Sequence, residues 1–246
     1  MRKITLIILG LCLSLSLMSQ TRKEIWSKDI DYLKTELSSR HPNLFFKTNR
    51  EIFLNRLDSI KNLIEVKTDI DLAIELQLAV AEIGDDHTAV DYYSKIKNNG
   101  RFPIFTYWYS DGLYVRQTTS QYESILGTKV TAINDIPIDS VILKCSPLIS
   151  RTNDAIIKYR IPNTINMVAT LEYYNLIQSD SVLFSSTSIS GEKIDTWIKA
   201  INSNTPKSEI RFIPENYGQD SDDKNGMFWS KVLADDKTVY AKYNVC

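Results

Sequence analysis

The sequence predicts an α+β protein in which an N-terminal helical bundle precedes a β-rich module. Between residues 24 and 84, apolar residues recur at steps of three and four, the spacing of amphipathic helices. From Phe102 the pattern changes to short β-type runs separated by turn dipeptides. The 246 residues, 43% of them hydrophobic, are enough to build a buried core in both parts.

The N-terminus has the pattern of a secretory signal peptide. Arg2 and Lys3 precede an uncharged run over residues 4–18, and small polar residues follow. The run is too short to cross a bilayer comfortably, and an uncleaved anchor is the alternative. The residue before Cys12 is not small, which argues against a lipoprotein. We expect residues 1–19 to be removed and the mature chain, without a membrane span, to be secreted or periplasmic.

The charges are nearly balanced, with 29 Lys and Arg residues against 30 Asp and Glu residues and a net charge of -1. Such a chain has no general field that attracts nucleic acid, and no Lys/Arg cluster indicates a local patch. After cleavage Cys145 and Cys246 would remain, and export permits either a disulfide between them or two independent thiols. No Cys/His spacing indicates zinc. We therefore predict neither nucleic-acid binding nor a zinc site.

Three helices are expected in the bundle, over residues 24–40, 48–64 and 68–84, and the bundle is assigned to residues 20–98. Each helix has one apolar face, so the three are expected to pack as a small antiparallel bundle. The faces consist of Trp26, Ile30, Leu33 and Leu37, then Phe53, Leu57, Ile60 and Ile64, and finally Leu72, Leu76, Ala79, Val80 and Ile83. Leu33, Leu57 and Leu76 are predicted to lie in the core.

Capping and stop signals set the predicted helix ends. The first helix stops at His41, because the following proline disfavours helical backbone there. Thr48 and Glu51 have the spacing of a capping box for the second helix. The third helix begins at Thr68 or Asp69 and stops at Gly84.

Strands and short helices are expected after residue 98. Asp111-Gly112 suits a tight hairpin turn, and the strand before it is apolar on both faces, so we expect that strand to be largely buried. A second turn is expected at Asn134-Asp135, followed by a helix capped by Asp139. A further helix is predicted over residues 166–177. Additional strands are expected near residues 180–187, 210–213 and 237–246.

Residues 216–226 form a polar segment with a partial likeness to a calcium loop. Asp220 and Asp222 match its opening, but Lys224 stands where a third oxygen ligand belongs. We predict a solvated loop and no metal there.

The sequence has few candidates for covalent chemistry. No glycine precedes a serine in nucleophile-elbow spacing, and Gly-rich phosphate loops are absent. Ser-x-x-Lys matches begin at Ser94, Ser190 and Ser221, all in polar stretches where such matches arise by chance. No cofactor is predicted.

Asp85, Asp86 and His87 form the strongest candidate site. They follow a helix C-terminus, where unpaired carbonyls favour a cation. A neighbouring aspartate could orient the imidazole as in a catalytic triad. The alternative is that His87 only caps the helix, and composition alone favours it. His41 has no acidic neighbour in the sequence, so a structural role is expected for it.

Four stretches, in order, resemble the N-terminal half of exported bacterial tail-specific proteases, also called C-terminal processing peptidases. They are "DIDYLKTELSSRHPNLFFK", "TDIDLAIELQLAVAEIGDDHTAV", "FPIFTYWYSDGLYV" and "GTKVTAINDIPIDSVI". In that family a helical region ending in a D-G-H-T segment precedes a PDZ-like module, and the serine protease core comes last. The likeness covers most of residues 24–246. Asp86 is a departure, since the family usually has glycine there.

The resemblance implies a PDZ-like and connecting α/β region over residues 99–205 and the start of a peptidase core over residues 206–246. It implies His87 as a candidate catalytic base, as in tricorn-like relatives. It also implies a peptide or an unfolded protein segment as the partner. The segments carrying the serine nucleophile and its lysine have no counterpart here, so we expect a truncated peptidase that is inactive alone.

Two other hypotheses remain open. The PDZ-like region could capture a peptide at a sheet edge without catalysis. The chain could also be an unrelated exported domain whose resemblance is accidental. The substrate and the oligomeric state do not follow from the sequence.

Overall fold

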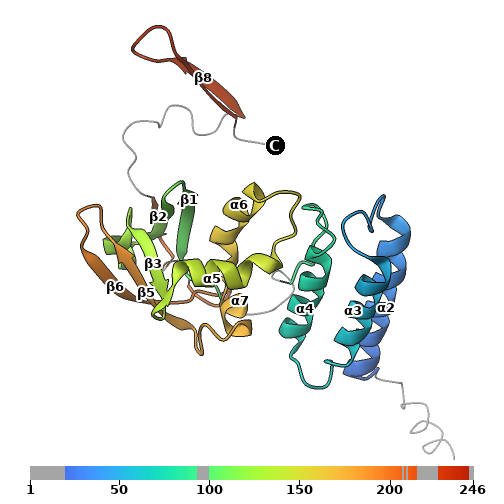
Figure 1. Ribbon diagram of the computed structural model, residues 1–246. Coiled ribbons are helices and arrows are strands. Elements are labelled where there is room, and N and C mark those ends of the chain that lie inside the picture. The colour runs from blue at the N-terminus through green and yellow to red at the C-terminus, as the bar shows by residue number, and fades with distance from the viewer. Residues whose placement is uncertain (1–19, 93–99, 207, 209, 215–226, 244–246) are drawn as a thin grey trace, which may run out of the picture. The chain divides into compact units, whose positions relative to one another are not determined.

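The structure is a computed structural model that describes residues 20–92, 100–206, 208, 210–214 and 227–243 (Figure 1). It divides into two compact units, Met1–Pro214 and Glu215–Cys246. The expected signal peptide, the polar segment 216–226 and Cys246 lie outside the described residues. Within the described residues, no helix combines the length and the apolar character that a membrane crossing requires.

The first unit begins with three helices, α2 (Arg22–Arg40), α3 (Arg50–Lys61) and α4 (Asp69–Ala81). Figure 1 shows α3 next to both α2 and α4, and the direct contacts between α2 and α4 are few. Of the three predicted core leucines, Leu57 and Leu76 are buried and Leu33 is half-buried. The remaining core of the bundle consists of Ile30, Leu44, Phe53, Ile60, Ile64, Leu72, Ala79, Val80 and Ile83.

The predicted helix ends are partly correct. α2 has a capping box made by Thr21 and Glu24 and ends at His41, its C-cap. Thr68 caps α4 as one of the two predicted alternatives. The prediction for α3 was wrong, because Asn49 rather than Thr48 accepts the first free backbone amides. The side-chain oxygen of Asn49 accepts the backbone amides that the Thr48 hydroxyl was expected to cap.

An antiparallel sheet follows the bundle, with strand order β1-β2-β3-β5-β6 and with β4 and β7 paired to β3 and β2. Its strands are β1 (Ile104–Tyr109), β2 (Gly112–Thr119), β3 (Lys129–Ile133), β4 (Ile136–Pro137), β5 (Ser181–Thr187), β6 (Lys193–Lys199) and β7 (Phe212–Pro214). In the described part of the chain β6 is an edge strand, paired only with β5. Short helices accompany the sheet: η1 (Ser120–Ile125), α5 (Ile138–Cys145), η2 (Ser146–Leu148), α6 (Ala155–Thr164) and α7 (Val168–Tyr173).

Both predicted turns are present. Gly112 has a φ of 153° in the β1–β2 hairpin, and Asn134 and Asp135 have φ values of 47° and 61° between β3 and β4. The expectation that β1 is largely buried was wrong, since Ile104 is the one buried residue of the strand and Tyr107 is 57% exposed. Asp139 does not cap α5 with its side chain.

Other elements differ from the expectation in extent. The helix expected over residues 166–177 is confined to α7, and the sequence did not predict α6 or β6. α6 contains Pro162, a residue that normally interrupts helices, which explains why the sequence pattern missed it.

The second unit, described by itself, holds a β-hairpin of β8 (Phe228–Val232) and β9 (Val239–Tyr243). β9 falls within the strand predicted at residues 237–246. The observed mixture of helices and sheet confirms the α+β class.

Candidate functional site

The loop after α4 carries the Asp85-Asp86-His87 triplet. α4 ends at Ala81, and Gly84 then adopts a φ of +75°, a left-handed conformation that suits glycine. A Cβ at this glycine would lie 2.5 Å from Cδ of Lys47. The same lysine donates from Nζ to the carbonyl oxygens of Gly84 at 3.0 Å and Thr152 at 3.3 Å. The glycine therefore lets the chain turn beneath the Lys47 side chain and start the loop.

Asp85 is the acceptor around which the loop is organised. Its Oδ1 accepts the backbone N–H of His87 at 3.1 Å, and its Oδ2 accepts the Thr88 hydroxyl at 2.5 Å. His41 Nε2 lies 3.2 Å from the same Oδ2. These bonds, that of Thr88 first, lower the pKa of Asp85 to about 2 because they stabilise the ionised carboxylate. Asp85 is thus an anion at any physiological pH.

His41 has an acidic neighbour that the sequence did not reveal. Its side chain is 14% exposed, and Nδ1 accepts the backbone N–H of Asn43 at 3.1 Å. An accepting Nδ1 places the proton of the neutral ring on Nε2, which then donates to Asp85. His41 and Asp85 are 44 residues apart, and they meet because α2 and α4 run in the same direction on either side of the antiparallel α3. The His41–Asp85 bond therefore joins the ends of α2 and α4.

His87 itself points to solvent, with 89% of its side chain exposed. Its Nδ1 lies 3.4 Å from Asp86 Oδ1 and 3.7 Å from Asp85 Oδ1. Among the described residues, the ring lies near these two carboxylates and makes no hydrogen bond to a carbonyl of α4. No described serine, threonine or cysteine side chain is hydrogen-bonded to it. The ring is thus flanked by negative charge on the Nδ1 side and is accessible on the Nε2 side.

Buried polar contacts hold the loop in place. Gln77, 4% exposed on α4, accepts the Val90 backbone N–H at Oε1 over 2.7 Å. Its Nε2 donates to Leu148 O at 2.6 Å and to Ser150 Oγ at 3.2 Å. Arg160 on α6 donates to the Asp86 carbonyl at 2.8 Å. One side chain, Gln77, therefore connects α4 and the loop to the end of η2 and to Ser150 just after it.

Donor atoms of Asp85, Asp86 and His87 lie within 4.8 Å of one another, which is a possible arrangement for a metal ion. It is the one group of this kind in the part of the chain that the structure describes. Both oxygens of Asp85 already accept hydrogen bonds from protein groups. The loop is therefore organised by internal bonds, and exposed acidic clusters are common without an ion.

The remaining chemical candidates show no catalytic arrangement. Lys193 donates to Asp195 at 2.8 Å, and Ser190 bonds to Ser188, so the Ser190–Lys193 match is not a serine–lysine pair. The matches beginning at Ser94 and Ser221 involve residues outside the described part. Cys145 is a buried thiol whose pKa is raised to about 12 by desolvation, which makes it unreactive.

Comparison with solved structures identifies a related fold, that of CPAF, a chlamydial serine protease resembling tail-specific proteases. Mature CPAF complexed with lactacystin matches 80% of this chain with a TM-score of 0.55 and 13% identity. A serine-to-alanine mutant of CPAF matches 74% of this chain with a TM-score of 0.56 and 12% identity. Mature CPAF matches 80% of the chain with a TM-score of 0.52 and 13% identity. The chain spans 34–36% of the length of these proteins. No protein-family model and no curated protein sequence matches this chain.

Proposed function

We propose that the chain is part of an exported serine-type peptidase related to the tail-specific proteases, with His87 as the general base. The observation that carries this proposal is the fold shared with the protease CPAF over 80% of the chain. The ordered resemblance of the helical and β-rich stretches to tail-specific proteases supports it independently. Because the matched structures are those of a protease, they do not favour a purely non-catalytic binding module.

The geometry of the loop fits the chemistry of a base. In acyl transfer, a serine Oγ attacks the substrate carbonyl while an imidazole nitrogen removes the hydroxyl proton. His87 would receive that proton on Nε2, its solvent side. The carboxylates near Nδ1 would stabilise the imidazolium that forms, as the aspartate of a catalytic triad does. Asp86 adds a second negative charge where the family usually has glycine.

None of the described residues places a nucleophile at His87. We therefore propose that the purified chain alone does not hydrolyse peptides and that the nucleophile is supplied by residues not in contact with His87 in this structure. The PDZ-like region, over residues 99–205, is proposed to present a peptide or an unfolded segment to such a site.

Labelling with a serine-reactive phosphonate tests the proposal. The tagged chain is exported, and labelling is measured both on the purified chain and on the chain within the exported protein fraction. We expect no label on the purified chain and a labelled serine polypeptide that co-purifies with it from the fraction. His87→Ala should lower that labelling by roughly two or more orders of magnitude, since the base is lost.

Three outcomes contradict the proposal. If a co-purifying serine is labelled equally with His87→Ala, His87 is not the base. If no labelled serine accompanies the chain, the peptidase role is refuted. A label on the purified chain that disappears with His87→Ala would instead place a complete site within these 246 residues.

A further inference from the structure

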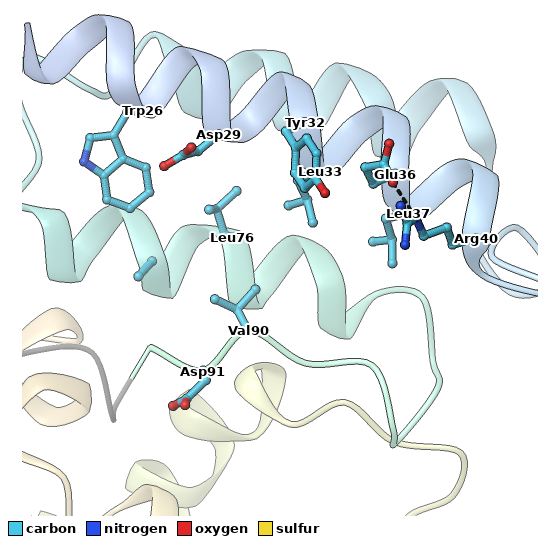
Figure 2. A pocket seen from close by; sticks show the side chains of 11 residues that line it. Trp26, Asp29, Tyr32, Leu33, Glu36, Leu37, Arg40, Leu76, Val90 and Asp91 are labelled. Atoms are coloured by element: carbon cyan, nitrogen blue, oxygen red, sulfur yellow. Dashed lines mark hydrogen bonds and ion pairs between the residues drawn. The ribbon is translucent and has the colours of Figure 1, made fainter. Parts of the chain in front are cut away.

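A groove runs between α2 and α4 on the side of the bundle that α3 does not cover (Figure 2). Its volume is about 640 Å³. Figure 2 shows Trp26, Leu33 and Leu37 pointing from α2 towards α4, with Leu76 and Val90 on the opposite side. The polar residues that line it are Asp29, Tyr32, Glu36, Arg40 and Asp91. The groove therefore has an apolar floor and a polar rim.

Bonds at both ends fix the spacing of the two walls. At the N-terminal ends of α2 and α4, Arg22 Nε and Trp26 Nε1 both donate to Asp69 Oδ1 at 2.8 Å. At the C-terminal ends, His41 bonds to Asp85. These hydrogen bonds hold α2 and α4 at a fixed distance at both ends, and the space between the two helices remains open. The groove is thus a preformed feature of the bundle.

We infer that this groove is a docking site for a basic amphipathic helix of a partner protein. The fifteen residues from Trp26 to Arg40 span about 21 Å of helix, which corresponds to about four turns. The two walls are helices whose backbone groups are already bonded, and in the loop that completes the lining Val90 is bonded through its N–H to Gln77 and through its carbonyl to the Tyr92 amide. The groove therefore offers an extended peptide few partners for its own N–H and C=O groups. A helix satisfies these groups internally and can bury an apolar face in the groove.

The charge of the rim determines the chemistry of the partner. Among the described residues that line the groove there are three carboxylates, those of Asp29, Glu36 and Asp91, and one cation, Arg40. Arg40 is held in an ion pair with Glu36. Asp29 is exposed and has no hydrogen-bond or ion-pair partner among the residues described. The apolar floor accordingly takes leucine-like side chains, and the rim takes lysine or arginine on the flanks of the same helix.

The site is independent of acyl transfer, because none of its residues takes part in the proposed chemistry of His87. A negative labelling experiment would therefore not contradict the docking inference, and a negative docking experiment would not contradict the peptidase proposal.

The test uses the full chain and a fluorescent synthetic peptide of fourteen residues, with leucines at i, i+3, i+4, i+7 and i+11 and lysines on the other face. An otherwise identical peptide with glutamates in place of the lysines is the charge control. Fluorescence anisotropy should show saturable binding of the basic peptide and at least tenfold weaker binding of the acidic one.

Two pairs of variants locate the binding. Asp29→Lys in the groove should weaken binding of the basic peptide about three- to tenfold, and Glu82→Lys, an exposed charge reversal outside the groove, should not. Tyr32→Ala, at a side chain 63% exposed on the rim, should weaken it as well, and Ile25→Ala, 44% exposed on the same helix, should not. Circular dichroism establishes that each variant is folded.

The inference is overturned if the basic peptide does not saturate, if both peptides bind equally, or if the groove variants bind like their controls. Analytical sedimentation of the chain alone tests whether a second copy of the chain occupies the groove. A concentration-dependent dimer that Tyr32→Ala abolishes would assign the groove to a second copy of this chain and would refute the heterologous partner.

Discussion

Replacing Gln77 by methionine tests whether the loop that carries His87 depends on a single buried side chain. The substitution keeps the length and approximate volume of the side chain but removes its polar atoms. It leaves the Val90 N–H and the Leu148 carbonyl without their partner, bonded in the native protein at 2.7 Å and 2.6 Å. A buried group left unpaired costs about 1–3 kcal/mol. Two such groups, one of them only partly buried, predict a loss of about 2–4 kcal/mol.

Urea denaturation measures this loss as a change in midpoint at constant slope. Hydrogen exchange at the Val90 amide should accelerate in the same variant, which separates a local loop effect from a general loss of packing. Gln121→Met, at an exposed glutamine, is the matched control and should change stability by less than about 0.5 kcal/mol. If Gln77→Met is as stable as the control, or if Val90 exchange is unchanged, the loop is held by other contacts and the reasoning is refuted.

Three further predictions concern packing, pH and export. Leu76→Ala should lower the unfolding free energy by about 2–5 kcal/mol, as truncations of buried leucines do. Leu143→Ala, at a residue that is 75% exposed, is the control and should change it by almost nothing. Equal effects of the two substitutions would mean that the predicted buried face of the helix is wrong. The folded-state pKa of Asp85 is depressed to about 2, so its contribution is present above about pH 4 and is lost as the pH falls towards 2. The stability difference between the native chain and Asp85→Asn should therefore be about 1–2 kcal/mol above pH 4 and vanish near pH 2, whereas a constant difference across this range speaks against the shift. The exported protein should lack about 19–20 N-terminal residues, and an intact mass that still includes Met1 to Met18 would contradict removal of a signal peptide.

The sequence predicted the bundle well because its helices are amphipathic and capped by local signals. Thr68 caps α4 as predicted, but α4 ends at Ala81, three residues before the predicted stop at Gly84, and the error at Thr48 is a shift of one residue to Asn49. Gly84 instead makes the left-handed turn that follows the helix. The hairpin turn at Asp111-Gly112 was also accessible, since it depends on neighbouring residues. Local chemistry was enough for these features.

The candidate site was only half visible, because its second histidine comes from a distant helix. His41 was judged by its sequence neighbours, none of which is acidic, while its partner Asp85 is contributed by the loop after α4. One signal was available: in an up-down-up arrangement the C-terminal ends of the first and third helices lie at the same end of the bundle. The sequence did not predict the role of Gln77, because a polar residue on an apolar helix face does not indicate which backbone groups it will bond to.

The edge strand β6 carries two lysines that oppose one mode of pairing between copies of this protein. An exposed edge can pair with the same edge of another chain and extend the sheet. Full-length antiparallel pairing of two β6 strands, centred on Thr196, would place Lys193 opposite Lys199 twice. Both lysines are exposed, and like charges directly opposite each other are destabilising. Lys193 and Lys199 also pair with Asp195 and Asp180 of their own chain, so the repulsion weakens this pairing without forbidding it. Replacing both lysines by valine would strengthen the pairing.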